Sequence, residues 1–274
     1  MGSSFSYIDG MTTLTPEQIL SYWDSGSLWP HGCGLDVPVA YERALTVRQL
    51  RIARGERPMG YKVGFTNRNI WPRYQVFAPI WGALWDTTVT FCEGEGAVSL
   101  RGTCQPRLEP EAVFGMAATP PANASPEDLF RCIAWVAPGF EIVQSHMPGW
   151  VFTAADTVAD CGLHARLLVG TKVPAAQVGR DVLEFDRRLA QARVTLKHGS
   201  DVVEAGVGAN VLDGPLHALH HFLQALRDCP GATDLQPGDV VTTGTWTDAW
   251  PVEAGQQWTA QFDAPLSPLR VVFT

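Results

Sequence analysis

The chain has 274 residues, of which 46% are hydrophobic and 18% are charged, and its formal net charge is −8. This composition is typical of a globular protein with a large buried core and excludes a disordered chain. The 20 basic residues are scattered along the sequence rather than clustered, which argues against nucleic acid as a partner.

The sequence contains no apolar run long enough for a transmembrane helix, and no signal peptide is recognisable. The six cysteines form no CxxC pair and have no spacing typical of a disulfide framework. We therefore expect a reducing, cytoplasmic location and no membrane partner. The opening residues MGSSFS match the loose myristoylation pattern through Gly2 and Ser6, but so short a pattern often matches by chance and is given no role.

The first predicted elements are two helices. The segment TLTPEQILSYW has Thr15 as N-cap, Pro16 at the first helical position and Gln18 three residues after the cap, which together form a capping box. A second helix is predicted over residues 39–55, where apolar residues recur at helical spacing until Gly55. Residues 1–60 are thus expected to form a small helical N-terminal part.

The character of the sequence changes at Tyr61, and residues 61–274 are expected to form one larger β-rich domain. Two helices are predicted within it, one after the N-cap Ser125 and one over residues 215–229. The expected fold class is α+β, with a mostly antiparallel or mixed β-sheet that curls on itself. The short apolar runs that indicate strands are GYKVGF, GALWDTTVTF, EPEAVF, GFEIVQS, ARLLVG, ARVTLKHGSDVVEAG and GDVVTTGT.

Two acids lie inside one of these apolar runs, CQPRLEPEAVF. Glu109 and Glu111 are two residues apart, so in a strand their side chains point to the same face. Like charges that close repel, which calls for a cation between them or for a protonated acid. Glu141, in PGFEIVQSH, offers a third carboxylate from another strand, and three such oxygens suit a hard divalent cation.

The simpler alternative is that these acids are surface glutamates on edge strands, and the spacing by itself does not decide between the two. The same ambiguity affects Lys62 in GYKVGFTN. A lysine in a short apolar strand usually extends its ammonium group to solvent. If it points inward instead, it could hold a substrate carboxylate or transfer a proton in the cleft.

Six segments, taken in order, resemble the fumarylacetoacetate hydrolase superfamily, and specifically its branch of 2-keto-4-pentenoate hydratases and 4-oxalocrotonate decarboxylases. Each motif is weak alone, but six in the family's order are specific, and they span about the last four fifths of the chain. The segments are GERPMGYKVGFTN (55–67), QPRLEPEAVF (105–114), PGFEIVQSH (138–146), DTVAD (156–160), GPLHAL (214–219) and LQPGDVVTTGT (235–245).

The resemblance implies a barrel-like core of curled sheets, a bound Mg²⁺ or Mn²⁺ ion and a substrate that is a 2-oxo or 2-hydroxy-dienoic acid. It assigns Glu109, Glu111 and Glu141 as metal ligands, and Lys62 and Asp86 as catalytic residues that place protons and hold the carboxylate. It also implies a homo-oligomer. A 2-oxo acid could chelate the metal, which would stabilise the negative charge on the 2-oxo oxygen as an enolate forms. Hydration and decarboxylation both use such an enolate.

The sequence departs from the hydratase pattern at the candidate substrate wall. Cys161 stands where the family usually has Asn, and Leu163 where a small hydroxyl residue is usual, with His164 next to them. An apolar side chain at this wall is less able to orient a water molecule, which favours decarboxylation or a related step on a bulkier apolar substrate. A tryptophan group points the same way if its loops reach the pocket; its members are Trp71, Trp81, Trp85, Trp246 and Trp250.

Other interpretations remain open. His217 and His221 share a helix face and could bind zinc, but no HExxH motif surrounds them. Cys161 could be a nucleophile, although no partner base is recognisable, and His164 could be an acid or base or simply structural. At the level of function, the alternatives to a metal-dependent lyase are a carbon–carbon bond hydrolase of the same superfamily and a non-catalytic accessory subunit.

Overall fold

The computed structural model describes residues 13–274. Gly2 and Ser6 of the myristoylation-like pattern lie outside the described residues. Within the described range, no helix combines the length and the hydrophobicity needed to span a bilayer. The same range contains all six cysteines, and every one of them is a free thiol.

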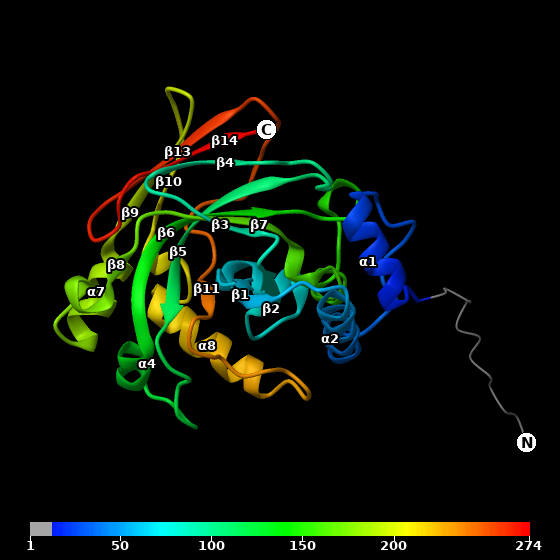
Figure 1. Cartoon of the computed structure of the whole chain (residues 1–274), viewed down its shortest axis with the longest axis horizontal. Helices are drawn as coiled ribbons and strands as arrows, with labels where there is room; N and C mark the ends of the chain where they lie inside the picture. The colour runs from blue at the N-terminus through cyan, green and yellow to red at the C-terminus, as the bar shows by residue number, and fades with distance from the viewer. Residues whose placement is uncertain (1–12) are drawn as a thin grey trace, which may run out of the picture.

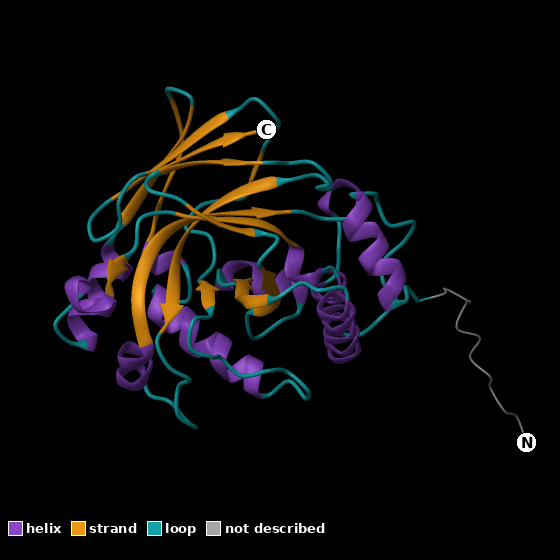
Figure 2. Cartoon of the chain, in the orientation of Figure 1, coloured by secondary structure: helices purple, strands orange, loops and turns teal. Residues whose placement is uncertain are grey.

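The helices surround a core of strands (Figures 1 and 2). Both N-terminal helices lie together at one side of the molecule, and α4, α7 and α8 lie along the opposite side and below the strands. Over residues 13–274 the helices are α1 (Pro16–Ser25), α2 (Val37–Ala53), α3 (Trp71–Tyr74), α4 (Pro126–Cys132), α5 (Ala154–Ala159), α6 (Ala175–Val178), α7 (Val182–Gln191) and α8 (Pro215–Arg227).

The larger sheet has the strand order β2-β1-β11-β5-β6-β7-β3, with β12 beside β5 and β8 beside β6. Although β2 and β3 stand at opposite ends of this order, residues 86–88 are all that separates them in the chain, so the sheet curls until its edges approach. Its strands are β1 (Pro58–Gly64), β2 (Ile80–Trp85), β3 (Val89–Phe91), β5 (Arg107–Met116), β6 (Ile133–Val143), β7 (His164–Val169), β8 (Val173–Pro174), β11 (Val240–Thr242) and β12 (Trp250–Pro251).

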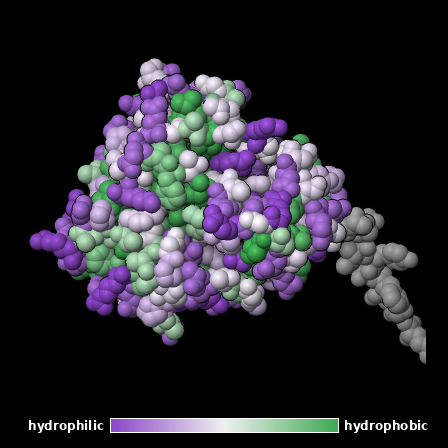
Figure 3. Space-filling model, in the orientation of Figure 1, coloured by the Kyte–Doolittle hydropathy of each residue, from purple (hydrophilic) through white to green (hydrophobic). Residues whose placement is uncertain are grey.

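A second sheet, in the order β10-β9-β13-β14-β4, lies beyond the long curved strands β5 and β6 (Figure 1). The main hydrophobic core contains residues of both sheets and of α8. On the face in Figure 3, hydrophobic residues show between hydrophilic areas over the middle of the molecule. The strands of this sheet are β4 (Glu95–Val98), β9 (Arg193–His198), β10 (Asp201–Val207), β13 (Gln257–Phe262) and β14 (Leu269–Phe273).

The curled mixed sheets and the two N-terminal helices agree with the prediction from sequence. Helix α1 begins with the predicted capping box, in which Thr15 accepts a hydrogen bond from the Gln18 amide and the Gln18 side chain accepts one from the Thr15 amide. Helix α2 begins after an Asp36 cap. The division into parts 1–60 and 61–274 stays a prediction. Helix α2 packs closely on the larger sheet, and its Arg51 lies against the rings of Trp23, on α1, and Trp85, on β2.

The expectation of two helices within residues 61–274 was wrong, because the structure also forms the four-residue helices α3 and α6 and the longer helices α5 and α7 there. The two longer ones start with a side-chain cap, Thr153 for α5 and Asp181 for α7. Helix α7 buries Phe185 and Leu189, which are four residues apart and so lie on one helix face. This short stripe lies among many charged residues, which is why it is easily overlooked in the sequence.

Candidate metal centre and cavity

Three glutamates from two neighbouring strands come together inside the larger sheet. Glu109 and Glu111 lie on the same face of β5, as strand alternation predicts, and Glu109 is directly opposite Glu141 on the antiparallel strand β6. Carboxylate oxygens from all three lie within 4.8 Å of one another. In residues 13–274 no other group of three or more potential ligand side chains was found. We call these three residues the glutamate cluster.

Two members of the glutamate cluster have one oxygen fixed and the other free. Oε2 of Glu111 accepts hydrogen bonds from the backbone amides of Thr243 (3.0 Å) and Gly244 (2.7 Å). Oε1 of Glu141 lies 3.0 Å from Nδ1 of His164. The remaining oxygens, Oε1 of Glu111 and Oε2 of Glu141, are buried and have no hydrogen-bond partner. Buried carboxylate oxygens without a partner are costly, so this arrangement indicates a missing positive charge.

Lys62 lies against the same cluster. It is in β1, it is 3% exposed, and its Nζ is 3.5 Å from Oε2 of Glu141. Burial favours the neutral amine, but the nearby carboxylates, Glu141 first among them, outweigh it and raise the pKa of Lys62 above its ordinary value. The side chain is therefore a buried ammonium group and does not extend to solvent, which was the alternative left open by the sequence.

The acids themselves are under electrostatic strain. Burial raises the pKa of Glu141 to about 7, with Lys62 opposing the shift and Glu109 adding to it. Burial and the two other carboxylates raise the pKa of Glu111 well above its ordinary value. One lysine does not balance three carboxylates. An all-oxygen donor set with two unpartnered oxygens fits Mg²⁺ or Mn²⁺, which prefer carboxylate ligands and balance this charge.

The position of Lys62 depends on a close approach of backbone from the segment 161–163. Cys161, Gly162 and Leu163 have φ angles of 54°, 68° and 65°, so three successive residues are in the left-handed region. A Cβ atom on Gly82, which is paired with Lys62 across β1 and β2, would overlap the carbonyl oxygen of Cys161. Glycine at 82 therefore lets this strained segment pack beside the lysine stem.

A cavity of about 490 Å³ opens onto the cluster. Lys62, Glu109 and Leu163 line it, and Arg73 and Arg107 are further cations in its wall. One side is a row of aromatic rings with centroids 4.8–6.0 Å apart, in the order Phe65, Tyr74, Phe152 and Trp150. The guanidinium of Arg107 lies 4.3 Å from the centre of the Trp150 ring. An anionic molecule with a flat or apolar tail suits such a cavity.

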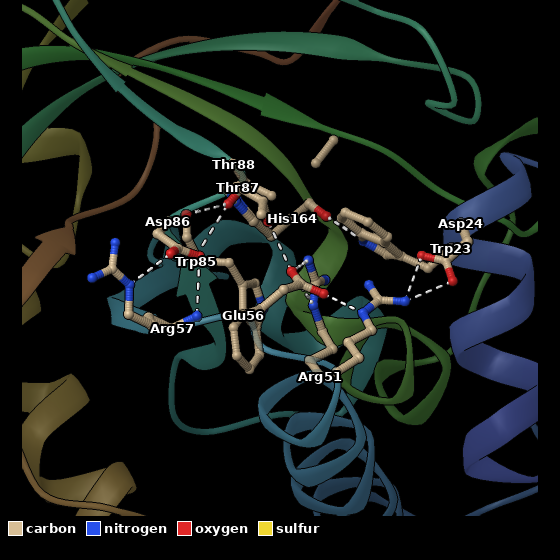
Figure 4. Close-up of polar contacts among 12 residues, drawn as sticks. Trp23, Asp24, Arg51, Glu56, Arg57, Trp85, Asp86, Thr87, Thr88 and His164 are labelled. Carbon is tan, nitrogen blue, oxygen red and sulfur yellow. Dashed lines mark hydrogen bonds and ion pairs between the residues drawn. The ribbon is translucent and has the colours of Figure 1, made fainter.

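Asp86 does not join this site. It follows β2 on the side of Arg57, whose amide donates to Oδ1 (3.0 Å) and whose Nε donates to Oδ2 (2.9 Å), as Figure 4 shows. It is not among the residues that line the cavity. Our expectation that Asp86 handles protons for the substrate has no geometric support, because both of its oxygens are bound to another residue. We do not retain it as a catalytic candidate.

The three residues predicted at the substrate wall have different positions. Leu163 lines the cavity, as expected. Cys161 does not; it faces a small space beside Arg51, and burial raises the pKa of its thiol to about 12, which argues against a nucleophile. His164 is buried behind Glu141, where burial, Lys62 and Arg51 lower its pKa well below the ordinary value and keep the ring neutral. Thus only Leu163 is placed to touch a substrate.

Several site residues could not be recognised from the sequence alone. Of the five predicted tryptophans only Trp246 lines the cavity, whereas Trp150 was not anticipated. Arg107 carried a usable signal, since it is two residues before Glu109 and shares its strand face. The amides of Thr243 and Gly244 carried none, because any residue type can supply a backbone N–H.

The chain is 30% identical over 242 residues to a 2-keto-4-pentenoate hydratase from Burkholderia vietnamiensis, covering 88% of this chain and 87% of that protein. This chain belongs to the 2-keto-4-pentenoate hydratase and 4-oxalocrotonate decarboxylase family. Another member, a 4-oxalocrotonate decarboxylase from a Pseudomonas species, is 29% identical and covers 84% of this chain and 86% of the relative. No family model matches the sequence.

Solved structures agree with membership of this family. The 4-oxalocrotonate decarboxylase from Pseudomonas putida G7 in complex with calcium and acetate superimposes with a TM-score of 0.79 at 25% identity, covering 96% of this chain and 99% of that one. In its complex with magnesium and adipate the TM-score is 0.83 at 23% identity, covering 94% and 95% of the two chains. Fumarylpyruvate hydrolase from Pseudomonas aeruginosa, a more distant likeness, has a TM-score of 0.54 at 18% identity and covers 80% of this chain and 89% of that chain.

Proposed function

We propose that the protein is a divalent-metal-dependent lyase that acts on a small 2-oxo or 2-hydroxy-dienoic acid, as a decarboxylase or a hydratase. The observation that carries the proposal is the pair of buried oxygens of Glu111 and Glu141 that have no hydrogen-bond partner. They belong to a cluster whose third member, Glu109, lines the cavity together with Lys62. The names of the relatives support the same reaction class.

The glutamate cluster would hold the cation through Glu109, Glu111 and Glu141. When bound, a divalent cation supplies Lewis acidity and positive charge next to the oxygens of a 2-oxo acid. The chain prepares this site in advance, since its backbone amides and His164 hold two of the carboxylates in place before any ligand arrives. Such preorganisation lowers the reorganisation needed when charge develops.

Lys62 is the proposed proton donor and carboxylate-binding group. Its ammonium group lies at the cavity wall with one donor toward Glu141, and its other N–H bonds are free to reach a substrate. In decarboxylation the carbon–carbon bond to the departing CO₂ breaks, and its electron pair moves into the 2-oxo system. A proton from Lys62 then adds to the carbon atom that CO₂ has left. Water restores the proton to the lysine when the product leaves.

Arg107 is the proposed second anchor for an anionic substrate. Within residues 13–274 it has no ion pair or side-chain hydrogen bond, although it shares the cavity wall with Glu109. Packing on Trp150 orients the guanidinium without using its N–H groups, so these stay available for a carboxylate.

Leu163 favours decarboxylation over hydration. Its side chain is part of the cavity wall, together with Ile80 and Val143, and none of these three can hydrogen-bond a water molecule. Addition of water to the far carbon requires a water held in place, whereas loss of CO₂ does not.

The finer assignments, a cytoplasmic location and a homo-oligomeric assembly, stay predictions that rest on the resemblance and the free thiols.

The test is an assay of the purified chain with 2-hydroxypenta-2,4-dienoate, with a 2-oxo-hexenedioate and with an acylpyruvate, each with Mg²⁺, with Mn²⁺ and after chelation. Loss of dienol absorbance with formation of a 4-hydroxy-2-oxo acid reports hydration, and released CO₂ reports decarboxylation. We expect metal-dependent CO₂ release that Glu109→Gln and Glu141→Gln abolish. Glu17→Gln, an exposed acid on α1, is the matched control and should leave the rate unchanged.

Two results would reject the proposal in different ways. Tight metal binding without turnover of any of the three substrates would indicate an accessory subunit. Hydrolytic cleavage of an acylpyruvate, with no CO₂ release or hydration, would indicate a carbon–carbon bond hydrolase.

A further inference from the structure

A buried histidine behind the glutamate cluster has a polar partner at each ring nitrogen. His164 is the first residue of β7 and is 1% exposed. Its Nδ1 lies 3.0 Å from Oε1 of Glu141. Its Nε2 lies 2.9 Å from Oγ1 of Thr88, in the turn between β2 and β3 (Figure 4). It does not line the cavity, so it does not reach a substrate.

Thr88 holds the far side of the ring. Its Oγ1 accepts a hydrogen bond from the Trp85 amide (3.2 Å), donates one to the Trp85 carbonyl (3.1 Å) and lies 2.9 Å from Nε2 of His164. These contacts keep Nδ1 directed at Oε1 of Glu141. An ionised metal ligand can only accept a hydrogen bond, so Nδ1 would be the donor when Glu141 holds a cation.

Glu141 is held in the same way as Glu111, through one of its two carboxylate oxygens. Two backbone amides fix Oε2 of Glu111 and leave Oε1 free, and His164 fixes Oε1 of Glu141 and leaves Oε2 free. Both free oxygens are buried within the same cluster. The side chain of His164 thus does for one carboxylate what the backbone does for the other.

The histidine is itself held from several directions. The Nε1–H of Trp23 on α1 donates to its carbonyl oxygen (3.2 Å), and so does the side-chain amide of Gln144 (3.3 Å). The turn that carries Thr88 is fixed by Glu56, which accepts from the hydroxyl of Thr87 (2.8 Å) and pairs with the buried Arg51 of α2 (Figure 4). The N-terminal helices therefore contact the residues that hold the ring.

We propose that His164 is a positioning residue for the metal centre, fixing one oxygen of Glu141 so that the other faces the cation. This rests on the proposed function, because it presupposes that the glutamate cluster binds a divalent ion. Partners of this kind orient ligands and raise metal affinity without touching the metal.

The experiment is a calorimetric titration of the full, metal-free chain with Mn²⁺, alongside the melting temperature of each metal-free variant. His164→Leu removes the hydrogen bond to Glu141 and should weaken Mn²⁺ binding about 10- to 100-fold. His164→Asn places an amide N–H near the position of Nδ1 and should restore affinity to within about threefold of the unmodified chain. His146→Leu is the matched control, since His146 is also fully buried and bonded to a carboxylate, that of Asp160, outside the cluster.

A purely structural role predicts a different result. The melting temperature would then fall in His164→Leu and His146→Leu alike, with Mn²⁺ affinity unchanged in both, and the positioning role would be rejected. If His164→Leu does not fold, equal weakening of Mn²⁺ binding in His164→Asn and in Thr88→Val would reject it, since Asn keeps the donor to Glu141. Failure of the unmodified chain to bind Mn²⁺, or binding that survives Glu109→Gln, would instead reject the metal site itself.

Discussion

The Nζ of Lys62 lies 3.5 Å from Oε2 of Glu141, and both side chains are buried. Because Glu141 Oε2 has no hydrogen-bond partner and faces the cluster, this contact places a proton donor and a candidate ligand oxygen side by side. This one buried contact therefore brings together the group proposed to transfer a proton and the group proposed to bind the metal.

Replacing Lys62 by Met should separate proton transfer from metal binding. Met fills a similar volume without the charge, and loss of the proton donor should lower kcat by a factor on the order of 10² or more. Mn²⁺ affinity should be unchanged or higher, because a neighbouring positive charge is removed. Steady-state kinetics measure kcat, and calorimetry measures the Mn²⁺ affinity. Lys197→Met on β9 serves as the control, and full activity in Lys62→Met would exclude the assigned role.

Substitution of Arg107 by Leu should act on substrate binding. Without the guanidinium, the KM for the anionic substrate should rise by about tenfold or more, which corresponds to loss of a charge-assisted hydrogen bond, while kcat changes less. Kinetics with saturating Mg²⁺ measure both constants. Arg187→Leu, at an exposed position of α7, is the control, and an unchanged KM in Arg107→Leu would show that the substrate does not reach this side chain.

The effect of Mn²⁺ on stability should depend on pH. Burial raises the pKa of Glu141 from 4.5 to about 7, so the folded chain holds this proton more tightly than the unfolded chain. The resulting stabilisation of the metal-free protein is fully present below about pH 4.5 and is lost as the pH rises through about 7. Mn²⁺ competes with the proton, so the rise in melting temperature on adding Mn²⁺ should grow from pH 5 to pH 8.

Thermal melts at fixed Mn²⁺ concentration across this range provide the measurement. In Glu141→Gln the growth with pH should be smaller, whereas Glu17→Gln should behave like the unmodified chain. A metal-induced shift that is equal at pH 5 and pH 8 would contradict the burial of ionisable ligands at this site.

Gly244→Ala should damage both the fold and the metal site. Gly244 has a φ of 95°, and a Cβ there would overlap the side chain of Thr66. The resulting strain should cost about 1–3 kcal/mol of unfolding free energy and displace the amide that fixes Glu111. Gly255→Ala is the matched control, with a φ of 86° and open space around the added methyl group.

Urea unfolding and Mn²⁺ titration distinguish the two variants. Both should lose stability, since alanine resists a positive φ, but only Gly244→Ala should lose Mn²⁺ affinity. Equal Mn²⁺ affinity in the two variants would mean that the Gly244 amide does not hold the ligand.

Local rules were enough to predict several parts of this protein. The capping box of Thr15 fixes the start of α1, and the two-residue period of a strand places Glu109 and Glu111 on one face. Both features depend on residues near one another in the chain. The expectation for Asp86 fails because it depends on more than local rules. Its position directly after a strand can be read from the sequence, but the path of the whole turn decides whether its side chain points into the cavity or bonds to Arg57.

The amino-acid sequence by itself determined the strand alternation, the helix caps and the order of motifs that places the chain in its family. The tertiary structure alone decided that Lys62 is buried, that Glu141 faces Glu109, and that each of two carboxylates keeps one oxygen free. Those outcomes depend on partners about 20 to more than 130 residues away, such as His164 and Gly244, and on how much water the packed chain excludes. Hydrogen-bond geometry and dielectric environment are properties of the assembled fold, and no local pattern carries them.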